Sequence, residues 1–191
     1  MLEREFHFPT PIYTKYIGTQ EYNDYLTNKI IHWSKRDQGI KLTNVYGWHS
    51  QTDMHMDTEY KYLVDELYLA YKEVYKDQHI ETEPSLANMW ANINPKGAFN
   101  KTHNHANAFW SGVYYVKTPE NCGSLVLEDT RTMSLMYTPK RTNTQKPKHL
   151  WEATSVEPQA GKLVMFPSYV SHYVVPNNSN EPRISISFNF K

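Results

Sequence analysis

The fold is decided by the stretch Gly161-Lys-Leu-Val-Met-Phe-Pro-Ser-Tyr-Val-Ser-His172, which is followed by Arg183-Ile-Ser-Ile-Ser-Phe188. The first part is a short apolar run that ends at a proline turn, and the second alternates apolar with polar residues. Runs of these two kinds, bounded by proline, glycine or asparagine, are typical of β-strands. We therefore expect strands at Lys162 to Phe166, His172 to Val175 and Arg183 to Phe190.

The same pattern reaches back along the chain to Pro84. Breakers such as Pro95-Lys-Gly97 and Pro119-Glu-Asn-Cys-Gly123 separate further apolar or alternating runs. These runs predict strands at Leu86 to Asn94, His103 to Val116, Ser124 to Glu128 and His149 to Ser155, and Asn107 to Phe109 could hold a turn within the second of them. Many short strands in succession are typical of a β sandwich or barrel.

The first 84 residues have a different pattern. Glu3 to Phe8 predicts a short strand, which Pro9 ends. Thr19 can cap a helix whose apolar residues recur at helical spacing, and a second amphipathic helix is expected from about Asp57 to Asp77. We therefore predict an α+β fold in one domain, residues 1–191, in which a helical scaffold with a short N-terminal strand (1–84) buttresses a β core (85–191).

The charge balance and the cysteine content exclude some classes of protein. Twenty basic and twenty acidic residues give zero net charge, so bulk charge indicates neither a nucleic-acid partner nor an anionic membrane. Cys122 is the single cysteine, which excludes an internal disulfide. No apolar run approaches the ~20 residues needed to span a bilayer, and the N-terminus lacks the layout of a secretory signal. We expect a cytoplasmic protein, and the sequence leaves its oligomeric state open.

The motif His103-Asn-His105 suggests a metal site. Residues i and i+2 of a strand point to the same side, so two imidazoles could share one face and a distant His172 could complete the set. Such a set leaves coordination positions open for a co-substrate and oxygen. Taken alone, the pair is equally consistent with surface or hydrogen-bonded core histidines, which is how we interpret the other six histidines, His49 among them.

Arg183 and Ser185 share one face of the last expected strand. A guanidinium and a hydroxyl two residues apart can together bind a carboxylate. If that face is turned toward the metal, the carboxylate belongs to a small acid that also reaches the ion. The alternative is that Arg183 pairs with an internal Asp or Glu.

Together these motifs resemble the non-haem iron, 2-oxoglutarate-dependent oxygenases. That family has a double-stranded β-helix (jelly-roll) core, a His-x-Asp/Glu…His triad and a downstream Arg-x-Ser. The resemblance covers roughly Asn88 to Phe190 and is greatest to a bacterial and phage branch with His-x-His followed by Ser-Gly-Val-Tyr-Tyr, here Ser111 to Tyr115. It extends more remotely to prolyl-hydroxylase-like enzymes.

The resemblance implies an Fe(II) enzyme that couples the oxidative decarboxylation of 2-oxoglutarate by O2 to substrate oxidation, as a hydroxylase does. Its residue roles, carried over by position, make the three motif histidines the metal ligands, and Arg183, Ser185 and Tyr115 the binding group for the far carboxylate of 2-oxoglutarate. Separately from the resemblance, Asn94 shares one face of its expected strand with Trp90 and Asn92, which indicates a contact with the co-substrate or substrate or, alternatively, a polar group satisfied at the edge of the sheet. The primary substrate, a small molecule or a peptide side chain, is not determined. Its recognition is expected at Trp48-His49 and at the basic loop Lys140 to Lys148.

His105 departs from the family pattern, because it stands where the wider family has its carboxylate ligand. Three neutral histidines leave Fe(II) with a net charge of +2 instead of +1, which strengthens its hold on an anionic co-substrate. Asp129 is the nearest spare carboxylate. It could ligate the metal, orient a histidine or pair with Arg131, and we favour the last two.

Two other classes of function remain open at this point. One is a cupin-like three-histidine metal enzyme that does not use 2-oxoglutarate. Arg183-Ile-Ser185 argues against it, because such a site needs no remote carboxylate clamp. The other is a non-catalytic β-sandwich binding module in which the histidines are incidental.

Overall fold

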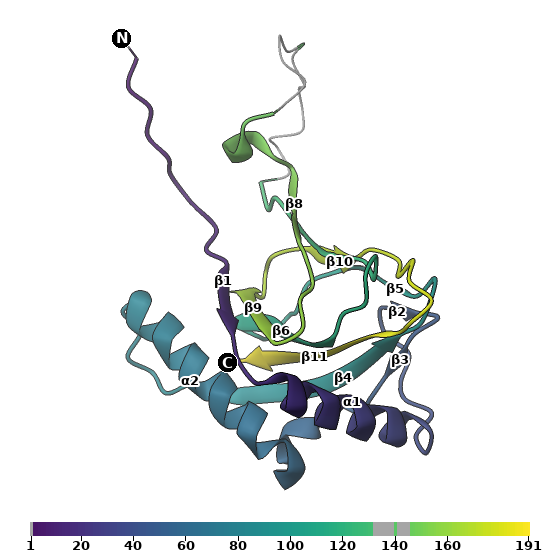
Figure 1. Ribbon diagram of the computed structural model, residues 1–191. Coiled ribbons are helices and arrows are strands. Elements are labelled where there is room, and N and C mark those ends of the chain that lie inside the picture. The colour runs from purple at the N-terminus through teal and green to yellow at the C-terminus, as the bar shows by residue number, and fades with distance from the viewer. Residues whose placement is uncertain (1, 132–139, 141–145) are drawn as a thin grey trace.

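Two antiparallel sheets face each other in the computed structural model, which describes residues 2–131, 140 and 146–191 (Figure 1). The larger sheet has the order β1-β9-β6-β11-β4-β3, and the smaller one β2-β5-β10-β7-β8. The strands of the larger sheet are β1 (Tyr13–Tyr16), β9 (Lys162–Pro167), β6 (Trp110–Lys117), β11 (Arg183–Phe190), β4 (Leu86–Asn94) and β3 (Trp48–His49). Those of the smaller sheet are β2 (Asn44–Val45), β5 (Phe99–His103), β10 (His172–Val174), β7 (Leu125–Glu128) and β8 (Ala153–Val156). This is the predicted α+β fold with a double-stranded β-helix core.

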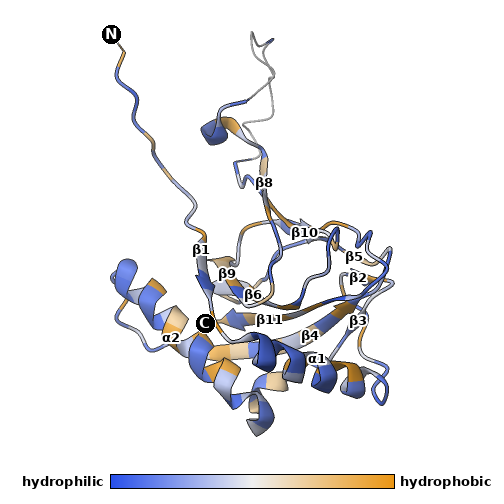
Figure 2. Cartoon of the chain, in the orientation of Figure 1, coloured by the Kyte–Doolittle hydropathy of each residue, from blue (hydrophilic) through white to orange (hydrophobic). Residues whose placement is uncertain are grey.

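Two helices cover the outer face of the larger sheet (Figure 1). Helix α1 (Gln20–Ser34) begins at the predicted cap, where Thr19 Oγ1 accepts the backbone N–H of Tyr22 at 3.2 Å. Helix α2 (Lys61–Asp77) follows two 3-10 turns, η1 (Met54–Met56) and η2 (Thr58–Tyr60). Hydrophobic and hydrophilic residues alternate along both helices, and the buried residues of each lie on the side packed against the sheet (Figure 2).

Strand β11 is central to the molecule, because it lies between β4 and β6 and separates the helix layer from the space between the sheets. Its apolar residues Ile184, Ile186, Phe188 and Phe190 are fully buried in the core that includes both helices. Phe190 stacks on Tyr71 of α2 with ring centroids 4.0 Å apart. The alternate residues of the strand face the other way, into the space between the two sheets.

Strands β4 and β11 have the predicted bounds, but the expected strand from His103 to Val116 is wrong. The structure divides it into β5 and β6, with residues 104–109 forming a turn between them. Asn107 lies in this turn with a φ of 64°. Asparagine tolerates this left-handed conformation better than other side chains, which is why the chain can reverse there.

The strand predicted at Glu3 to Phe8 is also wrong. Residues 2–12 form no strand and lead away from the sheets (Figure 1), and β1 begins only after Pro11. The backbone groups of β1 are paired with β9, whereas residues 2–12 take part in no strand pairing within the described part of the chain. The expected strand from His149 to Ser155 is likewise shortened to β8, which follows the 3-10 turn η4 (Lys148–Leu150). Within the residues that the structure describes, no helix is long and apolar enough to cross a membrane.

Candidate active site

Three histidines from two distant segments of the sequence meet between the two sheets. His103 is the last residue of β5, and His172, the first residue of β10, lies opposite it in the pairing of these strands. One ligand atom from each of His103, His105 and His172 lies within 4.8 Å of the other two. The structure therefore brings the predicted set together.

His105 reaches this group for a reason that differs from the predicted one. It lies beyond the end of β5, so the two-residue period of a strand does not set its direction. Its backbone N–H donates to the carbonyl of Ser168 at 3.0 Å, which fixes the turn after β5 against the end of β9. The expectation that His103 and His105 share one face of a single strand is therefore wrong, although both imidazoles reach the same site.

The Nδ1 atom of each imidazole is occupied by a hydrogen bond. His103 Nδ1 lies 2.7 Å from the carbonyl oxygen of Lys101, and His172 Nδ1 lies 2.9 Å from that of Val170. Carbonyl oxygens only accept, so Nδ1 of both residues carries the proton and Nε2 keeps its lone pair. His105 Nδ1 instead contacts two side chains, Asn189 Oδ1 and Ser111 Oγ.

Burial keeps these imidazoles neutral. It lowers the pKa of His103, His105 and His172, that of His172 to about 3, because a buried site disfavours the charged form. The neighbouring His103 further lowers the pKa of His172. Three neutral imidazoles with converging nitrogen atoms fit a divalent metal such as Fe(II), since a metal-binding imidazole must be unprotonated at the ligating nitrogen.

Arg183 is a buried cation at the start of β11, with 2% of its surface exposed. Its Nη1 atom donates to the backbone carbonyls of Cys122 at 2.6 Å and Gly123 at 2.9 Å. No carboxylate of the described residues pairs with it, so the alternative of an internal ion pair finds no partner there. Burial lowers the pKa of this guanidinium. A buried cation that only carbonyls contact provides a binding site for an anion.

A cavity of about 380 Å³ connects Arg183 with the three histidines. Ser185 and Tyr115 also line it, and they lie side by side in the pairing of β11 with β6. Burial raises the pKa of Tyr115, so its phenol stays protonated and can donate a hydrogen bond. Asn94 is buried and is not among the described residues that line the cavity, but its Nδ2 donates to Oδ1 of the lining residue Asn100 at 3.4 Å.

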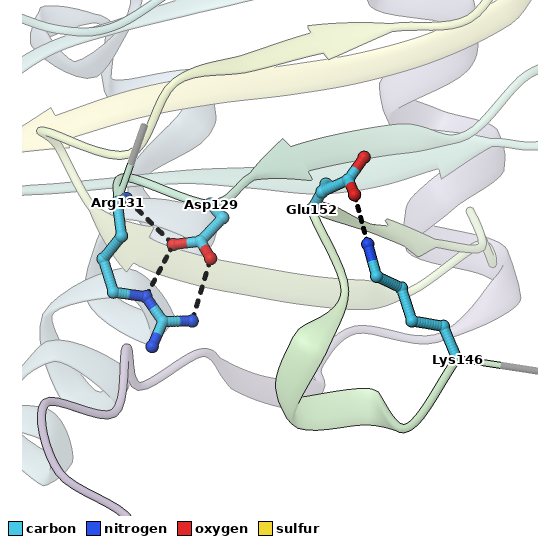
Figure 3. Close-up of polar contacts among 4 residues, drawn as sticks. All are labelled: Asp129, Arg131, Lys146 and Glu152. Atoms are coloured by element: carbon cyan, nitrogen blue, oxygen red, sulfur yellow. Dashed lines mark hydrogen bonds and ion pairs between the residues drawn. The ribbon is translucent and has the colours of Figure 1, made fainter. Parts of the chain in front are cut away.

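Asp129 lies outside the histidine group and pairs with Arg131, which is one of the two roles that we favoured; in the described residues the other role, orienting a histidine, is taken by different groups. Nε and Nη2 of Arg131 lie 2.9 and 2.8 Å from the two carboxylate oxygens (Figure 3), and this contact holds the pKa of Asp129 below its usual range. Figure 3 also shows Lys146 of the basic loop paired with Glu152. Residues 141–145 of that loop lie outside the described part of the chain.

The structure adds cavity residues that the motifs did not reveal. His49 was interpreted from the sequence as a surface or core histidine, although substrate recognition was expected at the segment Trp48-His49; it lines the cavity and stacks on Trp90 with ring planes 9° apart. Strand β3, which carries it, has only two residues and shows no periodic signal. Asn189 also lines the cavity. The sequence contained a signal for Asn189, because it follows Arg183 at an even spacing along β11 and residues at even spacing share one face of a strand.

Comparison with protein families gives one match over the β core. The model of a family described as "Putative 2OG-Fe(II) oxygenase" matches residues 88–189, which contain all of the cavity residues discussed above except His49. No curated protein matches the sequence significantly.

Solved structures share the fold at low sequence identity. A prolyl-4-hydroxylase from Pseudomonas putida has a TM-score of 0.65 and 17% identity, covering 95% of this chain and 92% of its own. A collagen prolyl hydroxylase of Paramecium Bursaria Chlorella virus-1, solved with 2-oxoglutarate, has a TM-score of 0.60 and 15% identity, with coverages of 93% and 95%. The alpha-ketoglutarate-dependent epimerase SnoN from nogalamycin biosynthesis has a TM-score of 0.69 and 11% identity, with coverages of 95% and 78%.

Proposed function

The chain belongs to the family of 2OG-Fe(II) oxygenases, and we propose that the protein acts as a hydroxylase. It is an oxygenase that depends on Fe(II) and 2-oxoglutarate and uses O2 as a further co-substrate. The single observation that carries the site assignment is the buried Arg183, without an acidic partner in the described residues, across one cavity from three neutral histidines. A dicarboxylate that reaches both ends of the cavity accounts for this arrangement.

His103, His105 and His172 are the proposed ligands of the metal. Bound Fe(II), together with 2-oxoglutarate and O2, supplies the oxidation, in which 2-oxoglutarate is converted to succinate and CO2 and one oxygen atom enters the substrate. The three imidazoles contribute no negative charge, so an ion held by them keeps its full +2 charge. That charge favours the binding of the anionic keto acid.

Arg183, Ser185 and Tyr115 are proposed to hold the far carboxylate of 2-oxoglutarate. The guanidinium neutralises its charge, while the serine and tyrosine hydroxyl groups donate hydrogen bonds. Asn94 is proposed to act on the co-substrate through Asn100, which it contacts and which lines the cavity. Holding the distal end of the acid in this way orients its keto acid end toward the histidines.

The choice of a hydroxylase over an epimerase rests on the groups that line the cavity. An epimerase must return a hydrogen to the opposite face of the substrate carbon, which requires a donor near that carbon. A tyrosine phenol could be such a donor. Among the described residues that line the cavity, Tyr115 is the tyrosine, and it lies beside Ser185 in the proposed carboxylate clamp, where it is committed to 2-oxoglutarate. A reaction that ends with oxygen transfer needs no such donor.

The substrate side of the cavity is proposed to receive a neutral group of a small molecule or a peptide. Its described lining includes His49, Trp90 and Asn88, and Arg183 is the cationic side chain among the described lining residues. Burial lowers the pKa of His49, so this imidazole also stays neutral. A charged substrate group would find no opposite charge on that side.

The test is turnover of the purified protein loaded with Fe(II), with 2-oxoglutarate and O2. We expect succinate and CO2 to form in a ratio of one to one, and we expect a substrate product heavier by one oxygen atom that derives from ¹⁸O2. Absence of succinate from a protein that holds iron would refute the use of 2-oxoglutarate. A product of unchanged mass, or one that has lost two hydrogens, would refute the hydroxylase assignment and leave the oxygenase standing.

A further inference from the structure

The three histidines of the site are oriented by two different kinds of partner. His103 and His172 donate to backbone carbonyls two residues before them, at Lys101 and Val170. No side-chain substitution removes those acceptors. His105 is instead oriented by side chains, which makes its geometry dependent on residues elsewhere in the chain.

A buried polar network surrounds His105 Nδ1. Ser111 Oγ lies 2.9 Å from His105 Nδ1, 2.7 Å from Asn189 Oδ1 and 2.7 Å from Ser168 Oγ. Asn189 Oδ1 itself contacts His105 Nδ1, and Asn189 Nδ2 donates to Asn88 Oδ1 at 2.7 Å. Ser111, Ser168 and Asn189 are all buried. A network so far from solvent must satisfy its donors and acceptors internally.

One direction of donation satisfies the whole network. Ser168 donates to Ser111, and Ser111 donates to Asn189 Oδ1, which also accepts the Nδ1–H of His105. The amide nitrogen of Asn189 is then directed to Asn88. In this arrangement His105 has its proton on Nδ1 and a free lone pair on Nε2, as a metal ligand requires.

We propose that Asn189, supported by Ser111, is the positioning residue that holds His105 in its metal-binding tautomer. The inference rests on the proposed function, since it presupposes that His105 ligates the metal. If the amide of Asn189 were reversed, its N–H would face Nδ1 and stabilise the tautomer with the proton on Nε2. That tautomer cannot bind a metal through Nε2.

The departure of His105 from the family pattern explains why such a network is needed here. A carboxylate ligand has two equivalent oxygens and no tautomer to select, whereas an imidazole needs an acceptor at its second nitrogen. Asn189 lies on the same face of β11 as Arg183 and Ser185. One face of a single strand therefore provides both the proposed clamp for the co-substrate and the acceptor for a metal ligand.

The experiment measures Co(II) affinity by the visible absorption of the bound ion, in the full chain and without 2-oxoglutarate or substrate. Asn189→Leu keeps the approximate size of the side chain and removes the acceptor. We expect it to weaken Co(II) binding about 10- to 100-fold, as is usual for loss of an outer-shell partner. Asn189→Asp offers only acceptors, so it should bind Co(II) within about threefold of wild type or more tightly.

Asn23→Leu is the matched control, because Asn23 is also a buried asparagine and its Oδ1 accepts the hydroxyl of Tyr114 at 2.5 Å in the helix layer. It should lower the unfolding temperature and leave Co(II) affinity unchanged. Equal affinity in wild type and Asn189→Leu would overturn the inference, and so would an equal loss in Asn189→Leu and Asn189→Asp. A wild-type protein that binds neither Co(II) nor Fe(II) would instead overturn the proposed function.

Ser111→Ala provides a comparison that does not depend on the folding of Asn189→Leu. It removes one donor to Asn189 Oδ1 and leaves the acceptor in place, so we expect a several-fold loss of Co(II) affinity. Wild-type affinity in Ser111→Ala combined with a marked loss in Asn189→Asp would contradict the network.

Discussion

Both faces of strand β11 are largely buried, and they are chemically opposite. The helix-facing residues Ile184, Ile186, Phe188 and Phe190 belong to one apolar core. On the cavity face, Arg183, Ser185 and Asn189 expose only 2 to 7% of their surfaces, although all three are polar. Burial alone therefore does not distinguish core from site in this protein. The distinction lies in what each buried group contacts, because a buried polar group needs a partner and an apolar one needs only close packing.

This comparison predicts that substitutions on the two faces have separable effects. Changes on the helix face should alter the free energy of unfolding and leave ligand affinities nearly constant. Changes on the cavity face, and in the histidines opposite it, should alter metal or co-substrate affinity more than stability.

The largest effect is expected from His172→Ala. This change removes one of three proposed ligands and leaves two imidazoles, so the folded variant should hold no iron after dialysis. Metal analysis of the purified protein checks this, with wild type handled in parallel. Stoichiometric iron in a folded His172→Ala protein would contradict the ligand assignment.

Phe188→Ala tests the helix face. Its ring is fully buried, and truncating a buried phenylalanine typically costs about 3 to 5 kcal/mol of unfolding free energy. Denaturant unfolding of the metal-free protein measures this loss. Under conditions where the variant is folded, its Co(II) affinity should stay within about threefold of wild type. A large loss of affinity would show that the two faces are coupled.

Arg183→Ala tests the other face of the same strand. Loss of the charge-assisted hydrogen bonds should weaken 2-oxoglutarate binding by about 2 to 3 kcal/mol, or roughly 30- to 150-fold, while iron stays bound. Calorimetric titration of the Fe(II) protein with 2-oxoglutarate under anaerobic conditions measures the affinity for the co-substrate. Metal analysis of the same protein measures the iron that stays bound. Arg183→Lys keeps the positive charge, so its loss of 2-oxoglutarate affinity should be smaller than that of Arg183→Ala. Unchanged 2-oxoglutarate affinity in Arg183→Ala would refute the co-substrate assignment.

The smallest effect is expected from His105→Asp, which restores the carboxylate of the wider family. Asn189 can turn its amide to donate to this carboxylate, so Fe(II) should remain bound within about tenfold of wild type. The lower charge of the site should weaken 2-oxoglutarate binding slightly. Loss of iron from the folded variant at saturating Fe(II) would count against placing His105 at the carboxylate position.

Some of the molecule could be predicted from the sequence because the signals were local. The cap at Thr19, the bounds of β4 and β11, and the clustering of His103, His105 and His172 were predicted correctly. The strand at Glu3 to Phe8 failed because a strand exists only where a neighbour pairs with it. The single strand from His103 to Val116 failed because the turn at Asn107 depends on one backbone conformation.

The contacts of His49 and Asn189 were not predicted, although substrate recognition was expected at the segment Trp48-His49. His49 enters the cavity through the pairing of β3 with β4, where it lies opposite Asn92. That pairing joins segments more than forty residues apart in the sequence, and nothing in the local pattern predicts it. The contact between Asn189 and His105 likewise joins the C-terminal strand to the turn after β5.

By itself, the sequence determined the class of fold and the types of side chain at the site, because periodicity, turn residues and motif spacing are properties of short segments. Only the tertiary structure decided that Arg183 is buried against the carbonyls of Cys122 and Gly123, and that Asn189 reaches His105. Register between strands and desolvation set these contacts, and both arise only when distant segments pack together.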